Sequence, residues 1–220
     1  MSVTDTSGAR SVEGPTGRLE VVVHTPRPAA DSGERPTPRA AVVLAHPHPQ
    51  HGGTMHSNVV HHMANALSRI GYIVVRFNFR GVGASTGTFD GGVGESDDFG
   101  AMLDYAAEQY PGLGLYAAGY SFGGRIALTT GATDPRVQLL LAVAPPVDRD
   151  MTPVLATRKP TFLIHGERDG LVPLKAMWRF YATLQEPKEL VVVDAADHTF
   201  DGKTSEVGDA VVDLLEDFEL

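Results

Sequence analysis

The sequence predicts an α/β protein in which a mostly parallel, doubly wound sheet is covered by helices on both faces. Short apolar runs, typical of buried strands, alternate with amphipathic patterns of about 10 to 15 residues, typical of helices. Strands joined through helices pair in parallel. The chain has 220 residues, of which 42% are hydrophobic and 20% charged, so it is long enough for one well-buried domain and short for two.

A flexible leader is expected at the N-terminus, before the first strand of the sheet. Residues 1–16 are polar, rich in Ser, Thr and Gly, and carry no apolar period. Residues 17–220 are expected to form a single domain. Two β-rich runs at 18–25 and 40–46 flank the Pro-containing stretch 26–40, and their pattern predicts a hairpin.

After this hairpin, strand and helix patterns alternate to the end of the chain. Helical patterns cover 57–71, 97–110, 122–132, 174–184 and 206–220, and strand patterns cover 72–79, 113–119, 137–143, 161–166 and 188–194. This regular alternation is the main basis for the parallel sheet.

Composition narrows the classes of partner. The formal net charge of −9 disfavours nonspecific binding to nucleic acid or anionic membranes. The chain has no cysteine, which excludes disulfides, thiolate metal ligands and a cysteine nucleophile. Its N-terminal residues lack the apolar core of a secretory signal, and no run reaches the roughly 18 apolar residues of a spanning helix. We therefore expect a cytoplasmic protein that acts on a small molecule, without nucleic acid or membrane partners.

The pattern Gly-x-Ser-x-Gly, which marks a serine nucleophile on a sharp turn, occurs around both Ser85 and Ser121. The chemistry needs a strand that runs directly into a helix, with small residues on either side of the serine. Ser121 follows the strand pattern 113–119 and precedes the helical pattern 122–132. Ser85 also follows a strand, but the glycine-rich residues after it show no helical pattern. Ser121 is therefore the predicted nucleophile.

The loop around Ser85 has a second interpretation as a nucleotide-binding turn, because Gly81, Gly83 and Gly87 follow a strand. The sixth position of the dinucleotide pattern is Thr86 instead of glycine, no helix start follows to hold a pyrophosphate, and there is no Walker lysine. We expect a structural or pocket-edge loop here, and no cofactor.

A serine nucleophile needs a base and an acid that orients the base. In folds with this turn, the order along the chain is Ser, then Asp or Glu, then His. Asp169 and His198 each lie just beyond a successive predicted strand, at the edge where open α/β sheets collect functional groups. Three acids compete with Asp169: Asp148, which also follows a strand, Asp194 and Asp197.

Five stretches, spread from residue 46 to residue 200, carry a family resemblance. They read HPHPQHGGTMHSNVV, VVRFNFRGVGASTGTFDGGVGE, GYSFGG, HGERDGLVP and ADHTF. With them the chain resembles the α/β-hydrolases, and most closely a compact, lidless bacterial group of esterases. The resemblance implies an α/β-hydrolase fold over 17–220 and a serine hydrolase whose catalytic triad is Ser121, Asp169 and His198.

The expected chemistry is acyl transfer in two steps. His198 takes the proton from Ser121, the serine attacks a carbonyl, and water then hydrolyses the acyl-enzyme. Larger members of the family insert a lid between the strands here predicted at 137–143 and 161–166, where this chain has only residues 144–160. A site without a lid favours short carboxylic esters or thioesters as substrates.

The negative charge that develops on the carbonyl oxygen needs fixed N–H donors. One is expected to be the backbone amide of Phe122, the residue after the nucleophile. The second is expected from the loop HPHPQ after the strand at 40–46, in which the prolines have no N–H and the first histidine belongs to the strand end. The backbone amide of His48 is therefore the first choice and that of Gln50 the second.

The histidines of the same loop support a rival hypothesis, a metal-dependent hydrolase. His46, His48 and His51 have the spacing of the H-x-H-x-D-H motif of metallo-β-lactamase-like enzymes. Gln50, however, replaces the motif's aspartate, and other ligands are not apparent at recognisable spacings, so we expect no metal. A third alternative is a binding module that keeps the fold without catalysis, although no triad member is missing from the sequence.

Overall fold

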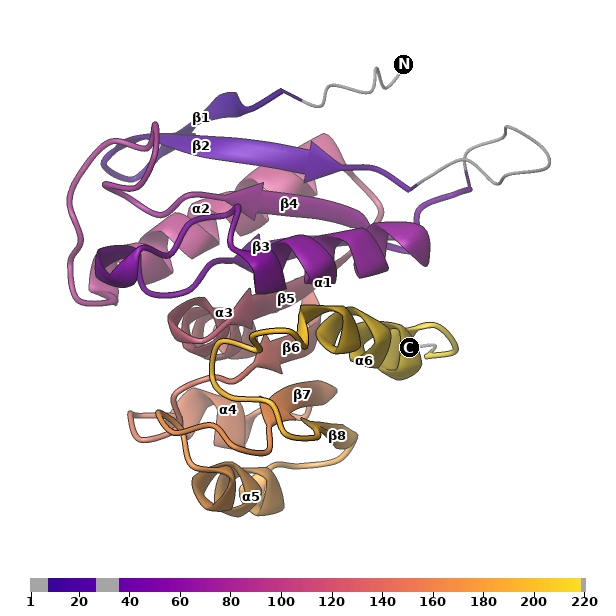
Figure 1. The fold of residues 1–220 in the computed structure, drawn as a ribbon. Helices are drawn as coiled ribbons and strands as arrows, with labels where there is room; N and C mark the ends of the chain where they lie inside the picture. The colour runs from indigo at the N-terminus through magenta and orange to yellow at the C-terminus, as the bar shows by residue number, and fades with distance from the viewer. Residues whose placement is uncertain (1–7, 27–35, 219–220) are drawn as a thin grey trace.

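The computed structural model describes residues 8–26 and 36–218, which form an eight-stranded sheet with helices on both faces (Figure 1). The strands are β1 (Arg10–Gly14), β2 (Gly17–His24), β3 (Ala40–Ala45), β4 (Ile73–Phe77), β5 (Gly114–Tyr120), β6 (Val137–Val143), β7 (Thr161–Gly166) and β8 (Lys188–Val193). Their order across the sheet is β1-β2-β4-β3-β5-β6-β7-β8. The pairs β1–β2 and β2–β4 are antiparallel and the other pairs are parallel, which confirms the predicted class.

Helices cover both faces of this sheet. They are α1 (Asn58–Arg69), α2 (Val93–Gln109), α3 (Phe122–Thr133), α4 (Thr152–Ala156), α5 (Leu174–Thr183) and α6 (Thr204–Leu215), with a 3-10 turn η1 (Pro49–His51) after β3. Although far apart in sequence, α1 and α6 pack side by side on one face (Figure 1). Buried residues of α2, α3 and α5 form the core on the other face.

The central strand β3 shows why the sheet is covered twice. All six of its residues are buried. Because side chains alternate along a strand, Ala41 and Val43 pack into the core beneath α2 and α3, whereas Val42 and Leu44 pack into the core beneath α1 and α6. Each fully buried Val or Leu contributes about 1.5–3 kcal/mol. A strand buried on both faces needs the continuous apolar run that its sequence shows.

The strand order reverses at β3, and this reversal positions the site. From β3 the chain crosses to β4 on one side, and later returns to form β5 on the other side of β3. Open α/β sheets bind ligands at such a switch point, beyond the C-terminal ends of the strands. The loop after β3 and the corner after β5 therefore meet at one edge of the sheet.

Two N-terminal predictions are wrong. Residues 10–14, expected within the flexible leader, form β1, because they pair in register with β2 while partly buried Val12 packs against the core. The expected hairpin of 18–25 with 40–46 does not form, since β3 pairs with β4 and β5 and leaves β2 to pair with β1 and β4. Residues 1–7 of the expected leader lie outside the described residues.

Helix α2 begins at Val93, four residues before the predicted start at 97. The carboxylate of Glu95 accepts the N–H groups of Asp90 and Gly92 at 3.0 and 2.7 Å, and this capping carries the helix back into the glycine-rich segment. The glycine-rich composition of this segment is therefore the reason that the sequence pattern does not predict the first turn of α2.

The segment between β6 and β7 is short and forms no lid. Residues 144–160 contain one helix, the five-residue α4, so the C-terminal edge of the sheet stays open there. Among the described residues, none of the helices combines the length and the apolar character needed to cross a membrane.

Candidate active site

Ser121 lies at the corner between β5 and α3. Its φ of 52° and ψ of −120° are values that residues with side chains rarely adopt. The corner is tight, because a Cβ at Gly119 would collide with the carbonyl group of Gly123. This geometry holds the Ser121 side chain at the end of the sheet, where it lines a cleft.

The structure brings three of the predicted site residues into one hydrogen-bonded chain. The Ser121 hydroxyl lies 2.8 Å from Nε2 of His198, and Nδ1 of His198 lies 2.7 Å from Oδ2 of Asp169. Asp169 follows β7 and His198 follows β8, so successive strand ends supply the two side chains. When Nδ1–H donates to the carboxylate, Nε2 of the neutral imidazole is free to accept the Ser121 O–H.

Asp169 is held from several sides. It is 5% exposed, and its Oδ1 accepts the backbone N–H groups of Leu171 and Val172 at 2.9 and 2.8 Å. Burial, the largest influence, raises the pKa of Asp169, but the hydrogen bonds from His198 and Val172 and the nearby histidine charges outweigh it and lower that pKa. Buried His165 lies 3.7 Å from Oδ2 and donates its Nε2–H to the Val172 carbonyl at 2.8 Å. The carboxylate is therefore kept ionised and fixed.

Tyr120 fixes the backbone of His198. Its hydroxyl donates to the carbonyl oxygen of His198 at 2.7 Å. Burial, with the negative charges of Asp169 and Asp197, raises the pKa of Tyr120, so the phenol stays protonated as a donor. Sequence reasoning missed this residue, whose only signal was its place directly before the nucleophile.

The three competing acids lie elsewhere. Asp148 is exposed on the wall of the cleft, and Asp194 is exposed beyond β8. Asp197 accepts the amide and hydroxyl of Thr199 at 2.9 and 2.8 Å. Asp169 is thus the acid that the structure places against His198.

His46 is a structural residue with both ring nitrogens engaged. Its Nε2 accepts the N–H of Phe79 at 3.1 Å, so the neutral ring carries its proton on Nδ1, which donates to the carbonyl of Pro47 at 2.6 Å. Complete burial lowers the pKa of His46 to about 4. A ring used in this way has no lone pair left for a metal ion, which argues against the rival hypothesis. Among the described residues, no group of three or more candidate ligands is arranged to hold a metal.

The loop after β3 holds His48 beside the Ser121 corner. The His48 ring stacks on that of His51 at 4.4 Å and lies 5.0 Å from the rings of Phe89 and Phe122. The amide of Gln50 donates to Nδ1 of His48 at 3.2 Å. The His48 amide donates to no group in the part of the chain that the structure describes. Of the two candidate donors in this loop, the amide of His48 is the one available.

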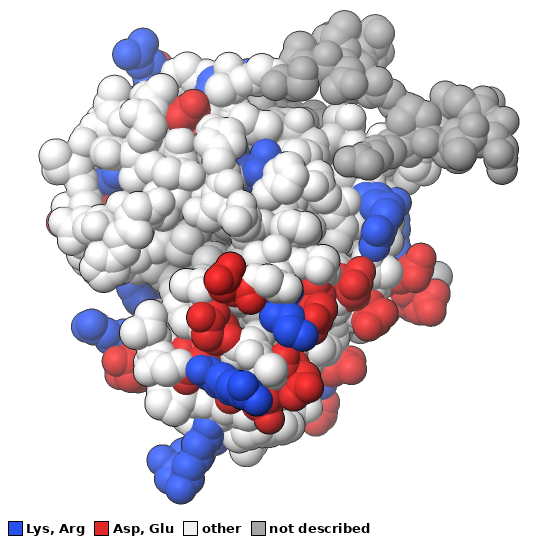
Figure 2. All heavy atoms as spheres, in the orientation of Figure 1, with Lys and Arg blue, Asp and Glu red and all other residues white. Residues whose placement is uncertain are grey.

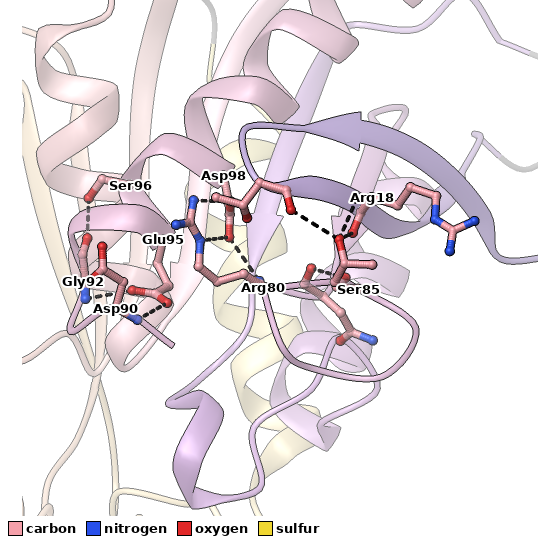
Figure 3. Close-up of polar contacts among 11 residues, drawn as sticks. Arg18, Arg80, Ser85, Asp90, Gly92, Glu95, Ser96 and Asp98 are labelled. Atoms are coloured by element: carbon pink, nitrogen blue, oxygen red, sulfur yellow. Dashed lines mark hydrogen bonds and ion pairs between the residues drawn. The ribbon is translucent and has the colours of Figure 1, made fainter. Parts of the chain in front are cut away.

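The loop of residues 78–92 forms a wall of the cleft through Phe89 and Gly91, and Ser85 anchors this loop (Figure 3). The buried Ser85 hydroxyl donates to the Asn78 carbonyl at 2.7 Å and accepts the Glu20 N–H at 2.9 Å. At the start of the same loop, Arg80 forms a buried ion pair with Asp98 at 2.7 Å. The prediction of a structural or pocket-edge loop is confirmed.

This anchored loop presents Phe89 to the site. The Phe89 ring lies 5.8 Å from that of Phe122, and both contact the ring of His48. Aromatic pairs at such distances contribute about 0.5–1.5 kcal/mol beyond area burial. The wall, the loop after β3 and the Ser121 corner therefore share one aromatic cluster.

All these elements open into one cleft of roughly 1440 Å³. Ser121 and His198 lie on its surface, together with apolar side chains that include exposed Leu155 and Leu171. Arg125, one helical turn after Ser121, also lines it, and the sequence offered no signal for this residue.

Comparison with known proteins assigns the class. The family model described as Serine aminopeptidase, S33 matches residues 36–159, so the chain belongs to this family of α/β-hydrolases. An uncharacterized protein of Rickettsia prowazekii is 33% identical over 213 residues, which cover 92% of this chain and 86% of that protein.

Two solved structures narrow the assignment. An alpha-beta serine hydrolase homologue from Coxiella burnetii is 35% identical with a TM-score of 0.88, and the match covers 97% of this chain and all (100%) of that one. XC6422 from Xanthomonas campestris, described as a serine hydrolase without a lid, is 34% identical with a TM-score of 0.86 over 96% of this chain and 94% of that one. The chain is a lidless α/β-hydrolase of the esterase-like group, as the resemblance implied.

Proposed function

We propose that this serine hydrolase is a carboxylesterase that cleaves short carboxylic esters or thioesters through an acyl-enzyme. The observation that carries the proposal is the hydrogen-bonded chain from Ser121 through His198 to Asp169, which opens into a cleft without a lid. Its chain order and geometry match those that acyl transfer requires.

Each member of the chain has one role. Nε2 of His198 removes the proton of Ser121 as the serine oxygen attacks the carbonyl carbon, and then gives that proton to the leaving alcohol or thiol. Asp169 accepts Nδ1–H, keeps the imidazole in the tautomer that can act as a base, and stabilises the imidazolium. Water activated by the same nitrogen then releases the acid.

The backbone amides of Phe122 and His48 supply the oxyanion hole in this proposal. Phe122 opens α3, and the first amides of a helix have no partner within it. The buried ring of His46 holds the neighbouring Pro47 carbonyl, so the loop that carries the His48 amide is fixed before the reaction. One such donor contributes about 2.7–4 kcal/mol to the transition state.

The open cleft sets the size of the substrate. Without a lid, a long acyl tail would stay largely in water and gain little from binding, so short acyl groups should react best. A chain-length series of p-nitrophenyl esters measures this directly. A rate that peaks at long acyl chains would contradict the open-site argument.

Covalent labelling tests the nucleophile. A fluorophosphonate probe is expected to modify wild-type protein at Ser121, as read by peptide mass spectrometry. Ser85→Ala is the matched control and should label like wild type, whereas Ser121→Ala should not label. Hydrolysis that resists the probe and is lost with a chelator would overturn the proposal and favour the metal hypothesis.

A further inference from the structure

The cleft contains a cation without a carboxylate partner. Arg125 lies on α3, four residues after Ser121, and it lines the same cleft. Helical side chains lean toward the helix N-terminus, so Arg125 extends back toward the nucleophile corner. It is half-buried, and its guanidinium lies 5.7 Å from the centre of the Phe122 ring. Within residues 8–26 and 36–218, no carboxylate forms an ion pair or hydrogen bond with it.

The wall of the cleft leaves room for this guanidinium. A Cβ placed on Gly92 would lie 2.6 Å from Nη2 of Arg125, closer than real contacts allow. Gly92 also has a φ of 105°, which disfavours any other residue. The loop that forms the wall therefore passes close to the Arg125 head at Gly92.

The charges around Arg125 leave it only partly compensated. Burial lowers the pKa of Arg125, exposed Arg149 lowers it further, and exposed Asp148 opposes both. Buried Arg80, in contrast, forms an ion pair with Asp98 at 2.7 Å. A cation that loses hydration without gaining a counter-ion is costly, and a bound anion would offset that cost.

We propose, resting on the ester hydrolysis above, that Arg125 determines specificity by binding a carboxylate that the substrate carries a few bonds from its scissile carbonyl. The Arg125 N–H donates to the Ser121 carbonyl at 3.0 Å, so the two residues lie one helical turn apart beside the same cleft, and a substrate group a few bonds from the scissile carbonyl can reach Arg125. The planar guanidinium matches a carboxylate in two-point hydrogen bonds. Nearby Asp148 favours a singly charged group over a doubly charged phosphate.

The attraction is local and does not come from the molecule as a whole. The net charge is −9, and acidic side chains gather over the region of α6 and β8 (Figure 2). A general field of this sign repels anions. Any preference for an anionic ester must therefore arise inside the cleft. Exposed Arg149 and Arg179 also line it, so substitution of half-buried Arg125 is needed to assign the preference to one residue.

Matched ester pairs test the proposal. Monoethyl glutarate and ethyl pentanoate differ only in a carboxylate that replaces the terminal methyl group of the acyl half. The pair 3-(butanoyloxy)propanoate and propyl butanoate places the same change in the alcohol half. Acid release is followed at constant pH. For at least one pair, wild-type kcat/KM is expected to be about tenfold higher for the acid ester, the size of a charged hydrogen bond.

Variants assign the preference to one residue. Arg125→Met should lower the acid-to-neutral ratio of kcat/KM about tenfold, and Arg125→Lys should recover part of it. Arg69→Met is the control. Arg69 is the last residue of α1 and lies outside the cleft lining, and its substitution changes the net charge by the same amount. Labelling of Ser121 by the fluorophosphonate reports whether each variant keeps its site.

The outcomes separate the two proposals. Neutral esters hydrolysed as well as or better than acid esters in both pairs, with Ser121 required, would overturn the role of Arg125 and leave ester hydrolysis standing. A preference that survives Arg125→Met in a protein that still labels would also overturn it. Hydrolysis of none of the four esters, together with no labelling, would overturn the proposed function itself.

Discussion

Ser121 and Ser85 sit in the same five-residue pattern, and their surroundings differ in every respect that matters for chemistry. Ser121 lies at a strained corner between a strand and a helix, half-buried, with its hydroxyl 2.8 Å from an imidazole nitrogen. Ser85 is buried in a loop, and its hydroxyl donates to the Asn78 carbonyl and accepts the Glu20 amide. The first hydroxyl faces a base and the second faces only backbone.

This difference shows what the pattern means. The glycines permit a tight turn in both places, but a hydroxyl becomes a nucleophile only where its proton can go to a base. At Ser85 the proton is held by a carbonyl oxygen and the lone pair by an amide. Substitutions of the two serines and of the histidines near Ser121 test this contrast.

Removal of the Ser121 hydroxyl should have the largest effect. Ser121→Ala is expected to lower kcat for a short p-nitrophenyl ester by about 10³-fold or more, because the remaining groups of a triad cannot replace the nucleophile. Steady-state kinetics measure the loss, and circular dichroism checks the fold. Turnover near that of wild type would remove Ser121 from the mechanism.

The distinction between the two serines could be predicted from the sequence because it depends on flanking elements. The patterns at 137–143 and 161–166 match β6 and β7 residue for residue, since strands buried on both faces leave continuous apolar runs. In contrast, β1 is an edge strand with mostly exposed side chains, so pairing alone defines it and composition could not.

The supporting contacts of the site were beyond sequence reasoning. The order of Ser121, Asp169 and His198 predicted which side chains should meet. Nothing in the sequence predicts that Tyr120 binds the backbone of His198, or that the His46 ring joins residues from two strand ends. Such contacts depend on the packing of segments far apart in the chain, and their roles in catalysis stay predictions.

A backbone substitution beside the Ser121 corner should have the second largest effect. His48→Pro removes the amide proposed for the oxyanion hole and is expected to lower kcat about 10²- to 10³-fold. His48→Ala keeps the amide and loses the ring contacts with His51 and Phe89, so a loss of less than about tenfold is expected. Equal inactivation of two folded variants would instead give the role to the imidazole.

His46 contacts both the Ser121 corner and the Ser85 loop, and its protonation should lower the free energy of unfolding. Its carbonyl lies against Gly123 of the Ser121 corner, while its ring accepts the amide of Phe79 near the Ser85 loop. The folded pKa of about 4 is below the 6.5 of a free imidazole, so the unfolded chain binds more protons between these values. Stability from this residue is complete above pH 6.5 and falls toward pH 4, by about 3 kcal/mol.

Urea unfolding from pH 7 to pH 4.5 measures this effect, with His46→Gln as the comparison because its amide can still bond within the loop. The free energy of unfolding of wild type should fall more steeply with acid than that of the variant. If the free energy of unfolding falls equally with acid in the two proteins, protonation of His46 does not destabilise the contacts between the Ser121 corner and the Ser85 loop.

The smallest effect on catalysis should come from the second serine. Ser85→Ala leaves the Asn78 carbonyl without its hydroxyl donor and the Glu20 amide without its acceptor, at a cost of about 1–3 kcal/mol in the free energy of unfolding. The ester turnover of the folded variant should stay within about twofold of wild type, because the ion pair between Arg80 and Asp98 still anchors the loop. Urea unfolding and steady-state kinetics on one preparation give both numbers. A variant with unchanged stability and a large loss of kcat would reverse the contrast between the two serines, since it would mean that the Ser85 hydroxyl takes part in the reaction.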